Sequence, residues 1–227
     1  MAVIVVGVSH HGAPLDVRER LAYRTSEVQG LLDRVRATAE VREAVLLSTC
    51  NRTELYVVEG EQPAAPAVWS LYAERLGSDA SGFGYVRRDR DAIAHLFRVV
   101  SGMDSMVVGE AQIHGQVRDA WETSRASSGA VLNRLFQSAL LVGGRVRSET
   151  ALGHGAMSVS SAAVQLAKKI FGSLVGKRAM VLGAGEMAEL ALASLQQDGV
   201  RAAIVANRTF ERAQALASLY GATAVKY

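Results

Sequence analysis

Short apolar runs alternate with amphipathic stretches over the first two thirds of the chain. The run 3–8 predicts a buried strand, and the runs 44–47 and 53–58 predict the two strands of an antiparallel hairpin. A further short strand is predicted at 85–86. Elsewhere the apolar residues recur at helical spacing. The predicted helices span 15–22, 67–76, 91–101, 112–127 and 131–150, and another starts at the capping pair Thr25-Ser26 and continues through Val35.

The last third of the chain follows a different order. Strands are predicted at 178–182, 202–206 and 222–225, and they alternate with a helix that ends at Gln197 and another at 210–219; a helix at 158–171 precedes them. This β-α-β-α-β order is typical of a doubly wound parallel sheet. The helical pattern of the preceding segment ends at Gly-His-Gly, residues 153–155, and a new order of elements begins after it. This change predicts two domains, 1–155 and 156–227. The predicted fold class is α/β, with an N-terminal α+β domain followed by a partial doubly wound parallel sheet.

Composition narrows the class of protein. A hydrophobic content of 49% and a charged content of 21% are ordinary for a globular protein. The single cysteine excludes an intramolecular disulfide framework and favours a reducing compartment, so we expect a cytoplasmic protein. The first apolar run lacks the basic flank of a signal peptide and is too short to span a bilayer, so no membrane partner is expected.

Net charge and histidine spacing bear on two further classes of function, nucleic-acid binding and metal binding. The net charge of +3 is compatible with a nucleic-acid partner but does not argue for one. The five histidines lie apart except for His10-His11, and no Cys/His cluster has the spacing of metal ligands. We therefore expect no metal site.

A glycine-rich turn predicts nucleotide binding. Gly183, Gly185 and Ala188 form the pattern Gly-x-Gly-x-x-Ala, which follows a predicted strand and opens a predicted helix. This is the context of the Rossmann dinucleotide turn, in which glycines let the backbone approach the pyrophosphate and the helix N-terminus faces it. The predicted cofactor-binding residues of this turn are Gly183, Ala184, Gly185, Glu186, Met187 and Ala188.

The end of the second strand of this domain bears on the choice of cofactor. NAD enzymes normally carry an acidic residue there, whereas this chain has Asn207-Arg208-Thr209. An arginine suits a 2′-phosphate, so NADP(H) is favoured over NAD(H). The alternative is that Arg208 is an exposed residue at the start of a helix.

Cys50 lies where the first predicted hairpin strand ends. A reactive cysteine needs partial exposure and a nearby positive charge, and Arg52 is placed to supply that charge. A buried, inert core cysteine is the competing interpretation, and local features do not separate the two. His95 falls outside the strongest apolar stripe of helix 91–101, so it either faces a polar cavity as an acid or base or lies at the surface. Sequence spacing cannot place it near Cys50.

Six segments together resemble the glutamyl-tRNA reductases, the NADPH-dependent enzymes that open the five-carbon route to tetrapyrroles (porphyrins). The resemblance covers nearly the whole chain in family order. The matching segments are Gly-Val-Ser-His at 7–10, Ser-Thr-Cys-Asn-Arg-Thr-Glu-Leu-Tyr at 48–56, His-Leu-Phe-Arg-Val at 95–99, Ser-Gly-Met-Asp-Ser-Met-Val-Val-Gly-Glu-Ala-Gln-Ile at 101–113, Ser-Val-Ser-Ser-Ala-Ala-Val at 158–164 and Gly-Ala-Gly-Glu-Met at 183–187.

The resemblance implies a role for each of these groups. Cys50 would attack the ester that links glutamate to tRNA(Glu), and NADPH would reduce the resulting thioester to glutamate-1-semialdehyde. Arg52 would pair with the substrate carboxylate, Glu110 would pair with the α-ammonium group, and His95 would donate a proton or orient the substrate. The implied substrate-binding residues are Thr49, Asn51, Arg52, Ser105, Glu110, Ala111, Gln112 and Gln116.

The chain also departs from the family pattern. Ala111 stands where many members have proline, and His114 stands where an apolar residue is usual. Family members are about twice as long, with a C-terminal helical dimerisation domain that this chain lacks, so we expect a truncated chain whose sheet edge is unpaired. The resemblance further implies a homodimer of the full-length protein and a glutamate-1-semialdehyde aminomutase as partner. The alternatives are a shikimate dehydrogenase-like NADP oxidoreductase and a non-catalytic fragment that binds tRNA or a protein.

Overall fold

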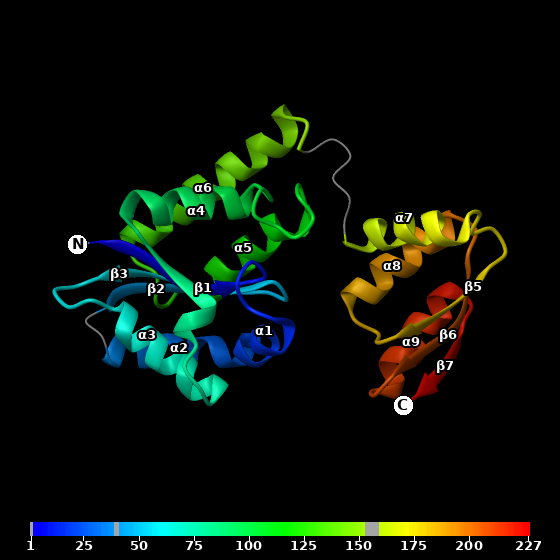
Figure 1. Ribbon diagram of the computed structural model, residues 1–227, viewed down its shortest axis with the longest axis horizontal. Coiled ribbons are helices and arrows are strands. Elements are labelled where there is room, and N and C mark those ends of the chain that lie inside the picture. Colours follow the sequence, from blue (N-terminus) through cyan, green and yellow to red (C-terminus); the bar gives the residue numbers. More distant parts are fainter. Residues whose placement is uncertain (1, 39–40, 153–158) are drawn as a thin grey trace. The chain divides into compact units, whose positions relative to one another are not determined.

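The chain consists of two compact units. A computed structural model describes residues 2–38, 41–152 and 159–227, and the units are Met1–Ala156 and Met157–Tyr227 (Figure 1). The predicted domain boundary at 153–155 and the predicted first residue of helix 158–171 lie outside the described residues. Over the described part of the chain, no helix is both long enough and apolar enough to cross a membrane.

The N-terminal unit is built on a four-stranded antiparallel sheet in the order β2-β3-β1-β4. The strands are β1 (Val3–Ser9), β2 (Val41–Ser48), β3 (Arg52–Glu59) and β4 (Gly84–Arg88). The predicted hairpin is confirmed: β2 and β3 pair from Val41 to Ser48, and Ser48 faces Thr53. The strands are longer than predicted because polar residues beyond the apolar runs, Glu43, Arg52 and Glu59, also lie buried within the sheet.

Helices cover both faces of this sheet, as Figure 1 shows. Helices α1 (Leu15–Leu21), α2 (Thr25–Thr38) and α3 (Ala65–Leu76) pack on one face, and α4 (Asp89–Val100), α5 (Gln112–Thr123) and α6 (Ala130–Glu149) pack on the other. A one-turn 3-10 helix, Ser81–Phe83, leads into β4. Successive strand residues point to opposite faces. Leu55 and Val57 therefore enter the core under α1–α3, whereas Tyr56 and Val58 enter the core under α4–α6.

Helix α5 ends at Thr123, one turn before the predicted end at residue 127. The serines that follow leave the helix because they complete the hydrogen bonding of the edge strand β2. The Ser127 carbonyl accepts a bond from the Ala44 amide at 2.9 Å, and the Ser124 hydroxyl accepts one from the Leu46 amide at 3.3 Å. A covered edge cannot pair with another chain.

The C-terminal unit contains a three-stranded parallel sheet in the order β5-β6-β7. The strands are β5 (Arg178–Leu182), β6 (Arg201–Asn207) and β7 (Thr223–Lys226), and the helices are α7 (Val159–Phe171), α8 (Glu186–Gln197) and α9 (Phe210–Tyr220). The predicted fold class is confirmed: an α+β unit precedes part of a doubly wound parallel sheet. Within the described residues β5 pairs with β6 alone, and Met180 and Leu182 on β5 are exposed.

Candidate active site

Cys50 lies in the tight turn between β2 and β3, and it is exposed. The Thr49 amide donates to the Arg52 carbonyl at 2.8 Å, and the Thr49 hydroxyl accepts from the Asn51 and Arg52 amides at 3.2 Å each. Hydroxyl-to-backbone bonds of this kind stabilise short turns. The thiol is therefore held outside the core on a well-bonded turn, which excludes an inert core cysteine.

The cation that contacts this turn is Arg18 on α1. Its Nη1 atom donates to the Cys50 carbonyl at 2.9 Å and to Asn51 Oδ1 at 3.2 Å. Partial burial raises the pKa of the Cys50 thiol, the Glu110 carboxylate raises this pKa further, and Arg18 lowers it. Sequence proximity pointed to Arg52 as the cation beside the thiol, but the Arg52 guanidinium is directed to other partners.

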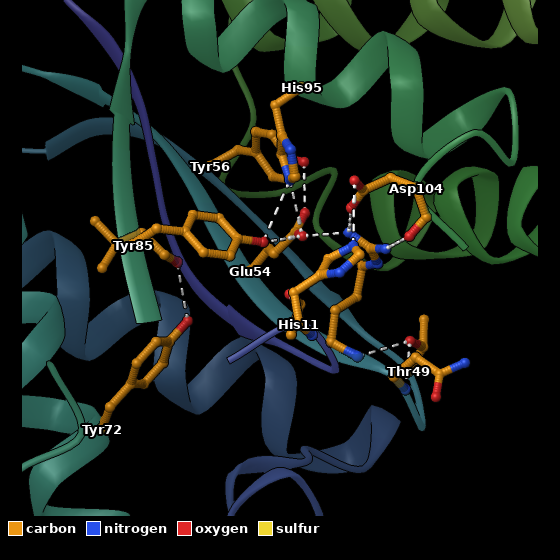
Figure 2. A network of polar contacts seen from close by, with 12 residues as sticks. His11, Thr49, Glu54, Tyr56, Tyr72, Tyr85, His95 and Asp104 are labelled. Atoms are coloured by element: carbon orange, nitrogen blue, oxygen red, sulfur yellow. Dashed lines mark hydrogen bonds and ion pairs between the residues drawn. The ribbon is translucent and has the colours of Figure 1, made fainter. Parts of the chain in front are cut away.

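Arg52, Glu54 and Tyr56 alternate along β3 and therefore lie on the same face of the sheet, the face covered by α4–α6. The side chains of all three residues are buried. Burying charged groups is costly unless they are paired and hydrogen-bonded. The contacts in Figure 2 show how this requirement is met.

Glu54 is the centre of the polar network. Its Oε1 atom accepts bonds from Arg52 Nη1 at 2.7 Å and the Tyr85 hydroxyl at 2.6 Å, and Oε1 lies 2.9 Å from His95 Nε2 (Figure 2). The Tyr56 hydroxyl donates to Oε2 at 2.6 Å. Burial by itself raises the pKa of Glu54, but the Arg52 charge and the bonds from His95 and Tyr56 outweigh burial and hold this pKa well below its ordinary range.

His95 is a buried residue of α4 and lies on the same helix face as the core residues Ala92 and Val99, so its predicted position outside the apolar stripe is wrong. Its ring faces the polar network. Its Nε2 atom contacts the Glu54 carboxylate and lies 3.3 Å from the Tyr85 hydroxyl. The surface alternative for His95 is thereby excluded. Since a carboxylate can only accept, Nε2 carries the proton toward Glu54.

Arg52 links the strand network to the segment between α4 and α5. Its Nη1 atom is 3.0 Å from Asp104 Oδ2, and its Nη2 atom donates to the Asp104 carbonyl at 2.5 Å. Asp104 Oδ1 also lies 3.5 Å from His11 Nε2. A continuous series of polar contacts thus connects exposed His11 to buried His95, through Asp104, Arg52 and Glu54 (Figure 2).

A glycine on β1 makes room for the central carboxylate. Gly7 pairs with Glu54 in the sheet, and a Cβ atom on Gly7 would lie 2.7 Å from Glu54 Cγ and 2.9 Å from the Thr53 carbonyl oxygen. Distances this short require the neighbouring atoms to move. The absence of a side chain at position 7 therefore leaves the space that the Glu54 side chain occupies.

The segment between α4 and α5 supplies further predicted site residues. Gly102 (φ 73°) and Gly109 (φ 84°) adopt left-handed conformations, and the Gly109 amide donates to the Gly102 carbonyl at 2.9 Å. Between and after these glycines, Ser105 and Glu110 are buried. Burial raises the pKa of Glu110. Ala111 and Gln112 follow at the start of α5, where the Ala111 carbonyl accepts a bond from Arg147.

Gln116 is one turn further along α5. It lines a depression of about 170 Å³ beside β2, together with Tyr23, Ser48 and other residues of α2 and α5. Hydrogen bonds bring Thr49, Asn51, Arg52 and His95 into the network and the turn, whereas Gln116 lines this depression.

In the C-terminal unit the Gly183–Gly185 turn joins β5 to α8. Gly183 has φ 107°, a conformation suited to glycine, and its amide donates to the Ala206 carbonyl at 2.8 Å. Among the atoms that the structure describes, none would lie within 4 Å of a Cβ on Gly183 or Gly185, so open space lies beside both residues. The structure describes the backbone but not the side chains of Glu186 and Met187.

The carboxyl end of β6 lies beside this turn because Leu182 pairs with Ala206. Asn207 bonds through Nδ2 to the Thr209 carbonyl at 2.9 Å, and Arg208 is exposed there. Open space at glycines, a helix N-terminus and an exposed arginine at one sheet edge fit a phosphorylated dinucleotide. In the part of the chain that the structure describes, no group of three or more His, Cys, Asp or Glu side chains could hold a metal ion.

Sequence reasoning missed five residues of this site: Arg18, Glu54, Tyr56, Tyr85 and Asp104. One signal was available for two of them, because Glu54 and Tyr56 stand two and four residues after Arg52 on a predicted strand and so share its face. Asp104 lies within the family-matching segment 101–113, which is a further signal. Arg18 and Tyr85 come from other elements, and no local pattern marks them.

Each of the two units matches a known protein family. Residues 6–150 match the family described as glutamyl-tRNA(Glu) reductase, N-terminal domain, and residues 165–227 match the family described as shikimate/quinate 5-dehydrogenase. The chain is 50% identical over 229 residues to a glutamyl-tRNA reductase of Rubrobacter xylanophilus and 43% identical over 233 residues to one of Pelotomaculum thermopropionicum. These alignments cover 99% and 100% of this chain, and 53% and 52% of the relatives.

A solved structure is also similar. The glutamyl-tRNA reductase from Methanopyrus kandleri is 36% identical, with a TM-score of 0.62 over 99% of this chain and 54% of that chain. The chain thus spans about half the length of the relatives that it matches.

Proposed function

Because the chain belongs to the glutamyl-tRNA reductase family, we propose that it carries the catalytic part of an NADPH-dependent glutamyl-tRNA reductase. Residues 1–155 form the catalytic domain that recognises glutamyl-tRNA(Glu), and residues 156–227 form the first part of the NADPH-binding domain. The product is glutamate-1-semialdehyde, the first intermediate specific to the five-carbon tetrapyrrole pathway. The observation that carries this proposal is the exposed Cys50 on a hydrogen-bonded turn within the part of the chain that matches the family's N-terminal domain.

Cys50 is the nucleophile. Its sulfur forms a bond to the carbonyl carbon of the aminoacyl ester, the bond from that carbon to the tRNA 3′ oxygen breaks, and the tRNA oxygen takes up a proton. NADPH supplies, when bound, the hydride that reduces the thioester to the aldehyde and frees the thiolate. His95 is the proposed proton donor or orienting group. Its contact with Glu54 fixes which ring nitrogen carries the proton.

Substrate recognition involves the two segments that flank the thiol. The buried Glu110 is the proposed partner of the α-ammonium group. The remaining proposed contacts are Thr49, Asn51, Ser105, Ala111, Gln112 and Gln116. Arg52 is the proposed partner of the substrate carboxylate. Its Nη atoms contact Glu54 and Asp104 in this structure, so the substrate carboxylate would replace Asp104 as a partner of the Arg52 guanidinium.

The cofactor would lie against the β5–α8 turn. The open space beside Gly183 and Gly185 supports close approach of a pyrophosphate, and Arg208 at the end of β6 supports recognition of the 2′-phosphate of NADPH. The proposed partners are glutamyl-tRNA(Glu), a second copy of the full-length protein and a glutamate-1-semialdehyde aminomutase, and the proposed location is the cytoplasm.

A single-turnover experiment tests the function. The chain is mixed with glutamate-charged tRNA(Glu) without NADPH, and intact-protein mass spectrometry follows the protein. We expect a glutamyl adduct in the wild type and none in Cys50→Ser, because serine is far less nucleophilic at this turn. A folded wild-type chain that forms no adduct and leaves the charged tRNA intact would contradict catalysis and favour a fragment that only binds tRNA or a partner protein.

A second candidate function is favoured by one observation, the match of residues 165–227 to the shikimate/quinate dehydrogenases. That function leaves Cys50 without a role. Alkylation of Cys50 separates the two, because it would abolish thioester formation and leave a shikimate-type oxidation unchanged.

A further inference from the structure

Arg18 connects helix α1 to the turn that carries the nucleophile. Its Nη1 atom donates to the Cys50 carbonyl at 2.9 Å and to Asn51 Oδ1 at 3.2 Å, and its Nε atom donates to the Ala13 carbonyl at 3.1 Å. A planar guanidinium that donates three hydrogen bonds holds its partners in a defined geometry. The side chain therefore ties together two segments that are 32 residues apart.

The helix that presents Arg18 is itself firmly anchored. Val17 and Leu21 of α1 are buried in the core beneath β1 and β3. The adjacent Ala13 is also buried. Arg18, by contrast, is only half-buried, so water still reaches part of it. The position of the guanidinium is thus determined by the core, and its charge is directed to the surface where the thiol lies.

Other charges near the turn are already balanced or have the opposite sign. Arg52 is paired with Glu54 and Asp104. Glu110 is an anion that disfavours a thiolate at Cys50. The charged and titratable groups around the turn are Arg18 on α1, His10 and His11 after β1, Arg52 on β3, and Asp104 and Glu110 between α4 and α5.

We propose that Arg18 is the positioning residue of the nucleophile, which holds the Cys50 turn through its hydrogen bonds and supplies the positive charge that favours the Cys50 thiolate. The proposal rests on the proposed function in so far as Cys50 is the nucleophile. It predicts that the thiol is most reactive when Arg18 is intact, and that the substrate's α-ammonium group adds to this effect when it neutralises Glu110.

Alkylation by iodoacetamide tests the proposal without tRNA or NADPH. Cys50 is the only cysteine, so the mass increase of the intact protein beyond that of Cys50→Ser reports this thiol alone. The rate is measured from pH 6 to pH 11 for the wild type, Arg18→Gln, Arg18→Lys and the control Arg20→Gln. Arg20 lies on the same helix, and its side chain contacts the Leu76 carbonyl instead of the turn.

For Arg18→Gln we expect the midpoint of the pH–rate curve to rise by about one pH unit, the low end of the effect of a nearby opposite charge. Alkylation would then be about tenfold slower near neutral pH and equal to wild type at the alkaline plateau, where every thiol is ionised. Arg18→Lys keeps the positive charge, so its pH midpoint should lie close to that of the wild type. The midpoint of Arg20→Gln should equal that of the wild type.

Two results would overturn the proposal. One is an unchanged midpoint in Arg18→Gln. The other is an equal loss of rate at every pH, plateau included, which indicates altered access to the thiol instead of altered charge. Failure of the proposed function has a different signature, because the wild type would then form no glutamyl adduct whatever the alkylation curves show.

Discussion

Replacing Glu54 with glutamine should destabilise the N-terminal unit by about 3 kcal/mol at neutral pH. Glu54 is fully buried and is contacted by Arg52, His95, Tyr85 and Tyr56. Removing one partner from a buried ion pair typically costs about 3–5 kcal/mol. We expect the low end of that range because Arg52 keeps Asp104 as a second anionic partner.

Urea unfolding followed by tryptophan fluorescence measures this loss in the correct unit. The only two tryptophans, Trp69 on α3 and Trp121 on α5, both belong to the N-terminal unit. With a urea m-value of roughly 2 kcal/mol/M, a loss of about 3 kcal/mol lowers the midpoint by about 1.5 M. Glu74→Gln is the matched control, since Glu74 forms an exposed ion pair and its loss should change the midpoint little.

The pH dependence gives an independent check on the same reasoning. Because the pKa of Glu54 is lowered in the folded state, its contribution to stability is complete above its ordinary pKa of 4.5 and is lost as the pH falls below that value. The stability difference between wild type and Glu54→Gln should therefore be largest at neutral pH and shrink below about pH 4.5. Equal urea midpoints at pH 7, or a difference that does not change with acidification, would refute the central role of this carboxylate.

Three further substitutions test other parts of the structure. Gly7→Ala should lower the free energy of unfolding by about 1–3 kcal/mol, because the added methyl group overpacks against Glu54. Gly30→Ala is the control, since Gly30 is an exposed helix residue with open space around it, and this change should not destabilise the protein. Urea midpoints distinguish the two variants, and equal midpoints would contradict the packing argument. Glu43→Gln should lose about 1 kcal/mol by the same assay because both Glu43 oxygens accept backbone amides at the start of α6; an unchanged midpoint would exclude that capping role. Arg208→Ala should weaken NADPH binding about tenfold or more and NADH binding far less, measured by fluorescence titration; equal losses would remove the argument for a 2′-phosphate.

Local patterns along the chain were sufficient for most of the fold. The apolar runs that flank Cys50 predicted a hairpin, and β2 and β3 form it with Ser48 opposite Thr53. The β-α-β order and the glycine turn predicted the parallel sheet of the C-terminal unit. The end of α5 was the main error, because Ser124 and Ser127 bond to the edge of β2, and this competing interaction is not local in sequence.

For the candidate site, too, local sequence patterns predicted some features and the tertiary structure determined the others. Sequence alone predicted Cys50 and His95 as candidate site residues, because the residues around them carry a family pattern, and strand alternation places Arg52 and Glu54 on one face. Only the tertiary structure decided what those side chains contact: Arg18 reaches Cys50 across 32 residues, His95 reaches Glu54 across 41, and Asp104 reaches Arg52 across 52. The physical reason is that periodicity determines which face of a strand or helix a residue occupies, whereas the packing of other elements on that face determines its partner, its burial and its charge.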